Sequence, residues 1–181
     1  MAKWYGGASI EGASIDQKEV FFQGPVRYCP KYGQVYASSE DIEGWVPNEY
    51  ADMTIWRGIR SGSIKSSLRM DIRTGARLAG KMIPIFSPLE ADRKENMRGR
   101  SYIYLIIIGV ASEYQGQGFG GKLLKALTEK CDQVGTPLYT ETTTERNVAM
   151  FEKLGFRALK KITLPIINLP QWEILRKPEE R

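Results

Sequence analysis

The feature that most constrains this chain is a glycine-rich stretch between an apolar run and an amphipathic helical pattern. Residues Tyr102 to Val110 are β-branched and apolar on both faces, which predicts a central strand. One face of a following helix is formed by Leu123, Leu124, Leu127, Cys131 and Val134. Gly135 is placed to end that helix. The segment therefore predicts a strand, a glycine-rich turn and a helix that packs back onto a sheet.

The rest of the C-terminal half continues this alternation of strands and helices. Apolar spacing and turn signals predict a strand over Leu138–Thr142, a helix from a capping box at Thr142–Glu145 to Leu154 that stops at Gly155, and strands over Phe156–Leu164 and Trp172–Arg176. This order predicts an α/β or α+β sheet with helices packed on it.

The N-terminal half is less regular. Residues 1–24 form a predicted tail, within which 19–25 slightly resemble an engineered protease site, although native sequence fits equally well. A hairpin is predicted over 34–47 and a helix over 54–73. Residues 84–101, rich in proline and then in charge, predict a surface loop. We expect one domain over 25–181.

Composition excludes several kinds of chemistry. The 181 residues contain no histidine and two cysteines, which removes histidine-dependent catalysis, imidazole metal sites and cysteine zinc sites. We therefore expect no metal. No apolar run is long enough to span a bilayer, and the N-terminus lacks a signal-peptide core, so a cytoplasmic protein without membrane contact is expected.

The net charge of +5 favours anionic partners. Five basic residues spaced by four form a slowly winding stripe on the predicted helix: Lys65, Arg69, Arg73, Arg77 and Lys81. No nucleic-acid recognition motif accompanies them, so we interpret the stripe as a solvated face and expect no nucleic-acid partner.

The glycine-rich turn has the composition of a phosphate site. Glycines at 116, 118 and 120 allow close approach of the backbone, and the dipole of the following helix favours an anion. Gly116, Gly118 and Gly121 also satisfy the dinucleotide-binding pattern, with Glu141 near the position of a ribose-binding acid. An oxidoreductase is therefore an alternative, although the glycines follow the strand late and few residues remain for further units.

The same residues resemble the GNAT superfamily of N-acetyltransferases. The superfamily's phosphate signature is matched by Gln115-x-x-Gly118-x-Gly120, and Thr140 to Phe156 is similar to its second block, which ends in Glu-Lys-Leu-Gly-Phe. The resemblance covers roughly residues 102–177. It implies a mixed central sheet with splayed middle strands flanked by helices, and acetyl-CoA bound between those strands. The implied acetyl-CoA contacts are Ile108, Gly109, Val110, Gln115, Gly116, Gln117, Gly118, Phe119, Gly120 and Asn147.

The resemblance also implies direct transfer of the acetyl group to a primary amine, on a small molecule or a peptide. Glu141, on the second splayed strand, is the preferred general base, with water, Tyr104 or Tyr139 as other proton routes. Many members have a tyrosine where this chain has Phe151, which cannot donate a proton and is interpreted as a core aromatic. A non-catalytic acyl-CoA-binding or regulatory module is thus an alternative, and a homodimer is left open.

Overall fold

The computed structural model describes residues 31, 47–48, 60, 87–106, 108–110, 114–164 and 168–179. Within these ranges the chain forms a five-stranded sheet in the order β1-β2-β3-β5-β4. Its elements are β1 (Pro47–Asn48), β2 (Ile103–Leu105), α6 (Phe119–Val134), β3 (Leu138–Thr142), α7 (Glu145–Glu152), β4 (Arg157–Leu164) and β5 (Leu169–Arg176). A further helix covers residues 87–96.

The sheet is mixed, as the sequence predicted. Strands β2 and β3 are parallel, whereas β1 pairs antiparallel with β2, and β5 pairs antiparallel with both β3 and β4. Parallel neighbours require a crossover connection, and α6 supplies it between β2 and β3.

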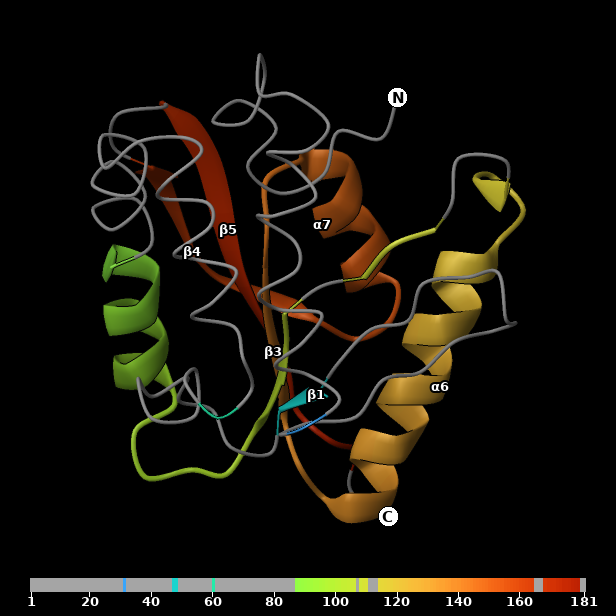
Figure 1. Cartoon of the computed structure of the whole chain (residues 1–181), viewed down its shortest axis with the longest axis horizontal. Coiled ribbons are helices and arrows are strands. Elements are labelled where there is room, and N and C mark those ends of the chain that lie inside the picture. Colours follow the sequence, from blue (N-terminus) through green and yellow to red (C-terminus); the bar gives the residue numbers. More distant parts are fainter. Residues whose placement is uncertain are drawn as a thin grey trace.

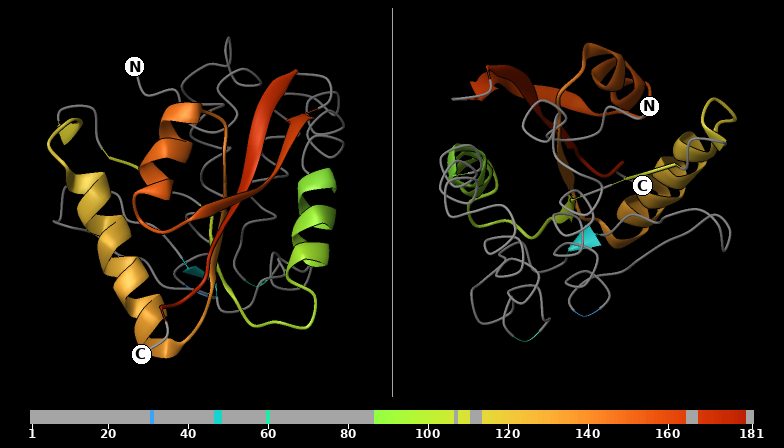
Figure 2. Two further views of the ribbon diagram at one scale, coloured as in Figure 1. Left: turned by 180° about the vertical axis from the view of Figure 1, so that it is seen from behind. Right: turned by 45° about the horizontal axis from the view of Figure 1, so that its top comes forward.

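Helices cover both faces of the sheet. Helices α6 and α7 lie on one side, and the helix over 87–96 lies on the other (Figures 1 and 2). The larger core joins the first side to the sheet, with Leu124 and Leu127 of α6 packed near Leu138 and Ile174. Because successive strand side chains alternate between faces, Tyr139 belongs to a second cluster with Met97 on the other side.

Strand β2 is shorter than the prediction of Tyr102 to Val110. Its pairing with β3 ends at Tyr104 opposite Tyr139, and residues 108–110 are not in a strand. The Thr140 hydroxyl donates a hydrogen bond to the Leu105 carbonyl at 2.9 Å. In a longer β2–β3 ladder, a backbone amide would bond to this carbonyl instead. The chain then leaves the sheet toward the start of α6 (Figure 1). The apolar run is continuous because Ile108 is still in the core, although it has left the ladder.

The prediction of a surface loop over 84–101 is wrong, because residues 87–96 are helical. Leu89, Arg93 and Met97 recur every fourth residue and are all buried against the rest of the protein. The charged residues that suggested a loop lie mostly on the outer face, where Lys94 pairs with Glu90 at 2.7 Å. The helical period was obscured because an arginine occupies the middle of the buried stripe.

The other boundaries differ from the predictions by a few residues. Helix α6 ends at Gly135, as predicted, with φ at 63°. Helix α7 is capped by Thr144 instead of Thr142, because the Thr144 hydroxyl is the one that accepts the Asn147 amide. Its last turn, to Gly155, is no longer α-helical, and β5 begins earlier than predicted, at Leu169.

The predicted hairpin over 34–47 and helix over 54–73 lie almost wholly outside the described residues. Within them, β1 supplies an antiparallel neighbour for β2, and Arg60 is helical. The basic stripe lies outside the described residues. The proposed boundary between a tail over 1–24 and a domain over 25–181 lies outside them too, so both stay predictions.

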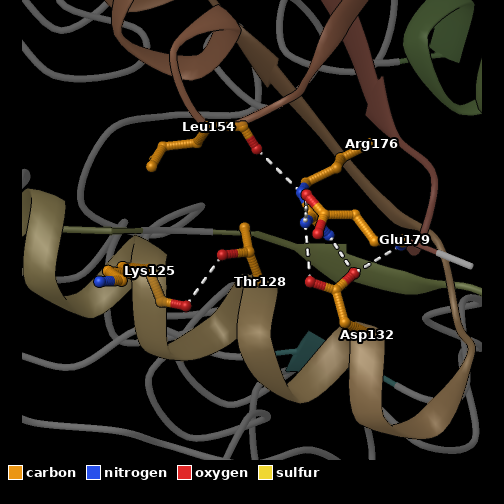
Figure 3. A network of polar contacts seen from close by, with 6 residues as sticks. All are labelled: Lys125, Thr128, Asp132, Leu154, Arg176 and Glu179. Carbon is orange, nitrogen blue, oxygen red and sulfur yellow. Dashed lines mark hydrogen bonds and ion pairs between the residues drawn. The ribbon is translucent and has the colours of Figure 1, made fainter. Parts of the chain in front are cut away.

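Arg176, at the end of β5, joins three segments of the C-terminal half (Figure 3). Its guanidinium donates to both carboxylate oxygens of Asp132 on α6, at 2.6 and 2.8 Å, and to the Leu154 carbonyl after α7, at 2.8 Å. The Glu179 amide also donates to Asp132, at 2.8 Å. This buried arginine fixes the C-terminal end of α6 to the sheet, and therefore the direction in which the N-terminal end of α6 points.

Candidate functional site

The shape of the glycine-rich turn depends on its backbone conformation and on one side-chain hydrogen bond. Gly116 and Gly118 have φ of 81° and 83°, in the left-handed region that glycine adopts without strain. The Gln115 side-chain amide donates to the Val110 carbonyl at 3.1 Å and closes the loop. Gly118 then caps α6, whose first intrahelical bond runs from the Lys122 amide to the Gly118 carbonyl at 3.0 Å.

The start of α6 has the properties of an anion site. The amides of Phe119, Gly120 and Gly121 precede the first intrahelical bond, so they have no acceptor within the helix. The first turn contains no acidic residue that would oppose the positive end of the helix dipole. A Cβ added at Gly116 or Gly118 would meet no other heavy atom within 4 Å, so both glycines face open space. A phosphate group can therefore approach this backbone closely.

The residues before the turn contribute mainly backbone. The Ile108 side chain is buried in the core, and Gly109 and Val110 are half-buried. A Cβ at Gly120 would lie 3.5 Å from the Val110 side chain, an ordinary contact, so this glycine is where the helix passes close to the chain that leads into the turn. Gln117 is exposed.

Asn147 and Phe151 lie on α7, near the end of β3. The Asn147 side-chain amide donates to the Thr142 hydroxyl at 3.0 Å, which ties the end of β3 to the first turn of α7. Phe151 is buried and packs edge-on against Phe156, with ring centroids 5.0 Å apart. The interpretation of Phe151 as a core aromatic is confirmed.

Glu141 is a buried carboxyl group where the two middle strands have separated. It lies two residues beyond the last pairing of β3 with β2, on the face opposite α6 and α7. The Tyr104 hydroxyl donates to Glu141 Oε2 at 2.8 Å, and Arg93 Nη1 lies 3.8 Å from Oε1. Burial raises the pKa of Glu141 to about 7, and Arg93 and Tyr104 only partly oppose this effect.

A second buried carboxyl group lies beside Glu141, on the neighbouring strand and on the same face of the sheet. Glu173 on β5 is its direct partner in the antiparallel register and is fully buried. The Tyr139 hydroxyl and the Asn96 amide donate to Glu173 Oε2 at 3.0 and 2.8 Å. Burial first, and then the neighbouring Asp92 carboxyl, raise the pKa of Glu173 to about 7.

Sequence analysis identified Glu141 and named Tyr104 and Tyr139 but missed the residues of the helix over 87–96 that lie around the two buried glutamates. Arg93, Asp92 and Asn96 fell within the segment expected to be a loop. Two signals were present in the sequence: an arginine in the middle of an apolar stripe of period four, and a glutamate inside the last predicted strand. Buried charged residues of this kind are uncommon unless they are paired or functional.

The described residues contain neither a candidate metal site nor a candidate membrane span. They contain no group of three or more acidic, cysteine or histidine side chains arranged to hold a metal ion. None of the helices in the described part of the chain has both the length and the apolar character that a membrane span requires.

Part of this chain is similar to a family of acetyltransferases. Residues 85–156 match the acetyltransferase (GNAT) family. An uncharacterized N-acetyltransferase of Schizosaccharomyces pombe is 28% identical over 144 residues, which cover 72% of this chain and 58% of that protein.

Solved structures that resemble the chain include the ribosomal-protein-S18-alanine N-acetyltransferase of Escherichia coli (22% identity, 44% of this chain, 56% of that chain, TM-score 0.40). Another is histone acetyltransferase HPA2 and related acetyltransferase of Corynebacterium glutamicum (23% identity, 46% of this chain, 45% of that chain, TM-score 0.42). The chain thus spans less than two thirds of the length of these relatives.

The matched segment runs from the helix over 87–96 through the glycine-rich turn to the end of α7. Residues 85–156 of this chain are thus similar to the GNAT acetyltransferase family. Members of this family use acetyl-CoA. The match favours acetyl transfer over the dinucleotide-binding oxidoreductase.

Proposed function

We propose that this protein is an N-acetyltransferase that transfers the acetyl group of acetyl-CoA directly to a primary amine. One observation supports this function above all others. A buried carboxyl group with a pKa of about 7, Glu141, lies where β2 and β3 separate, and the chain that diverges there leads to an open glycine turn. This arrangement supports a proton acceptor on one of the diverging strands and a phosphate site beyond the other.

The turn is the proposed site for the pyrophosphate of acetyl-CoA. Its left-handed glycines, free helix amides and lack of acidic neighbours fit a phosphate group. We assign the backbone of 108–110 to the pantetheine arm and Asn147 to a contact from α7. The proposed contact residues are Ile108, Gly109, Val110, Gln115, Gly116, Gln117, Gly118, Phe119, Gly120 and Asn147.

Glu141 is the proposed general base. A group with a pKa near 7 is both partly ionised and appreciably basic at neutral pH, which suits removal of a proton from an attacking amine. The Tyr104 hydroxyl bond fixes one carboxylate oxygen and leaves the other toward Arg93. Thiols have pKa values near 8.5, so a thiolate can leave without the tyrosine that Phe151 replaces.

A non-catalytic acyl-CoA-binding module is the second candidate. It is favoured by Phe151, whose ring is buried against Phe156 and has no proton to donate. The acceptor, whether small molecule or peptide, stays unassigned. The absence of nucleic-acid partners, the homodimer and the cytoplasmic location also stay predictions.

Incubation with acetyl-CoA and a panel of primary amines and peptides tests this proposal. We expect release of free coenzyme A, and a product heavier by one acetyl group, with at least one acceptor. Saturable binding of acetyl-CoA without release of coenzyme A across the panel would instead support the non-catalytic module. Absence of acetyl-CoA binding would contradict both.

A further inference from the structure

The two buried glutamates differ in their contacts with the helix over 87–96. Glu141 and Glu173 are direct partners in the register of β3 and β5, and both lie on the face of the sheet that this helix covers (Figure 2). Arg93 Nη1 lies 3.8 Å from Glu141 Oε1. Glu173 accepts hydrogen bonds from the neutral Tyr139 hydroxyl and Asn96 amide instead. Among the described residues, only Glu141 of this pair therefore has a cation at ion-pair distance.

The Tyr104 ring supports Arg93 from below. The guanidinium carbon of Arg93 lies 4.1 Å from the centroid of this ring, which is a cation–π contact. The hydroxyl group of the same tyrosine donates to Glu141 Oε2 at 2.8 Å. Tyr104 thus contacts the arginine with the face of its ring and the carboxyl group with its hydroxyl, which fixes the two charged groups relative to each other.

Arg93 acts on Glu141 by its charge. The 3.8 Å between Nη1 and Oε1 is too long for a hydrogen bond but short for two opposite charges in a buried place. No donor among the described residues forms a hydrogen bond with Oε1, so this oxygen can still accept a proton. A cation at this distance favours the ionised carboxyl group, which is the form that a general base needs.

A second buried arginine, Arg176, shows how an arginine is paired when it stabilises the fold. It donates to both carboxylate oxygens of Asp132, at 2.6 and 2.8 Å, and to the Leu154 carbonyl at 2.8 Å. Arg93 Nε, in contrast, is buried and has no hydrogen-bond partner among the described residues. Because an unsatisfied buried donor on a charged group costs stability, the position of Arg93 is better explained by its effect on Glu141 than by stability.

We propose that Arg93, supported by the Tyr104 ring, is a positioning residue that makes Glu141, and not Glu173, the general base by keeping the Glu141 carboxyl group ionised. The groups that face Glu141 are Arg93 from the helix over 87–96, Tyr104 from β2 and Glu173 from β5. Burial and the Glu173 charge raise the pKa of Glu141, whereas Arg93 and Tyr104 lower it. The proposal rests on the function proposed above, in which Glu141 removes a proton from the acceptor amine.

Arg93→Met tests this role. Methionine keeps an apolar side chain in the buried stripe of the helix but removes the charge, so Glu141 becomes harder to ionise. We expect the acid limb of the kcat/KM profile to move to higher pH by about one unit or more, because a cation this close lowers a carboxyl pKa by about 1–3 units. Arg93→Lys keeps a cation and should move the limb by no more than about half a unit.

Lys94→Met is the matched control for the loss of a positive charge. Lys94 is the next residue of the same helix, and its ammonium pairs with Glu90 at 2.7 Å. We expect no movement of the acid limb in this variant. A shift equal to that of Arg93→Met would overturn the proposal, because the limb would then respond to the charge of the helix in general.

Glu173→Gln tests the choice between the two glutamates. It keeps an acceptor for Tyr139 and Asn96 but removes the charge that raises the pKa of Glu141, so the acid limb should move to lower pH, opposite to Arg93→Met. We expect kcat to fall by less than about tenfold, against about 10²-fold or more for Glu141→Gln. An equal loss in the two variants, or an unmoved limb in Arg93→Met, would overturn the proposal.

Carboxyl NMR with ¹³C-labelled Glu gives a readout without substrate, with the Glu141 resonance assigned by its loss in Glu141→Gln. We expect Glu141 to titrate at higher pH in Arg93→Met than in the unmutated protein, and at the same pH in Lys94→Met. Arg93→Gln removes the same charge and replaces Arg93→Met in this comparison if the methionine variant does not fold.

The two measurements separate this proposal from the proposed function. An unchanged titration of Glu141 in the variant without the arginine would overturn the role of Arg93 even if acetyl transfer is found. A shifted titration without acetyl transfer to any acceptor would contradict the proposed function and with it the role of Glu141 as a base, while the contact of Arg93 with Glu141 would stand.

Discussion

The glycine turn and the buried carboxyl cluster are two regions built in opposite ways. The turn is formed by consecutive residues, offers backbone amides and is open to approach. The cluster is formed by side chains from the helix over 87–96 and from β2, β3 and β5, and its two glutamates, Glu141 and Glu173, are buried. The comparison teaches that a binding function can be encoded in one short segment, whereas a shifted pKa needs a folded environment.

The largest expected effect separates catalysis from binding. Glu141→Gln should lower kcat by about 10²-fold or more, because it removes the proposed base and keeps the Tyr104 bond. The Kd for acetyl-CoA should stay nearly constant, because the carboxyl lies on the face opposite α6. Steady-state kinetics and calorimetric titration measure the two effects. Full activity at every pH would show that Glu141 is structural.

A substitution in the glycine turn should instead change the Kd for acetyl-CoA. Gly118→Val should weaken acetyl-CoA binding by at least about tenfold, because charge-assisted bonds of about 1.5–3 kcal/mol each would be lost when a side chain enters the open space. Backbone strain is controlled by Gly99→Val, since Gly99 also has a positive φ (71°) and open space around its Cβ position. Equal loss of binding in both variants would remove the turn from the site.

The two regions should also differ in how they respond to pH. Glu141 and Glu173 have pKa values of about 7 in the fold, above the ordinary 4.5, so the folded state holds protons that the unfolded chain releases. Their contribution to stability is complete below about pH 4.5 and is lost as the pH rises through 7.

The free energy of unfolding should therefore fall with rising pH over this window, by at most about 1.4 kcal/mol per unit for each group. Urea titrations at several pH values measure the slope, and the double variant Glu141→Gln, Glu173→Gln should flatten it. Gly118→Val should leave the slope unchanged. Stability that rises over this window would contradict the shifted pKa values.

The last two variants, one of which has the smallest expected effect, concern the far end of α6. Asp132→Asn should lower the free energy of unfolding by about 2 kcal/mol, because the buried Arg176 guanidinium loses its charged partner (Figure 3). Glu179→Gln, whose side chain is 82% exposed, should change it by no more than about 0.5 kcal/mol. Denaturation curves compare them. A cost for Glu179→Gln equal to that for Asp132→Asn would show that Arg176 does not depend on Asp132.

Much of the fold could be predicted because its signals are local. The turn, the end of α6 at Gly135 and the bounds of β3 were predicted correctly, since each depends on glycine or on the apolar period of neighbouring residues. The helix over 87–96 was missed for the converse reason. Arg93 stands where its period requires an apolar residue, and its contacts with the Glu141 carboxylate and the Tyr104 ring accommodate a charge there.

The sequence by itself predicted the glycine turn, the crossover that contains it and Glu141 as the candidate base. Only the tertiary structure decided that Glu141 lies opposite Glu173, that Lys160, next to Glu173 in the register, pairs with Asp92, and that β2 leaves the sheet at Leu105. The contacts of Asn96 with Glu173 and of Tyr104 with Glu141 join residues 77 and 37 positions apart. Burial and charge interactions depend on distance in space, which a local pattern does not contain, whereas backbone conformation at glycine depends on the residue itself.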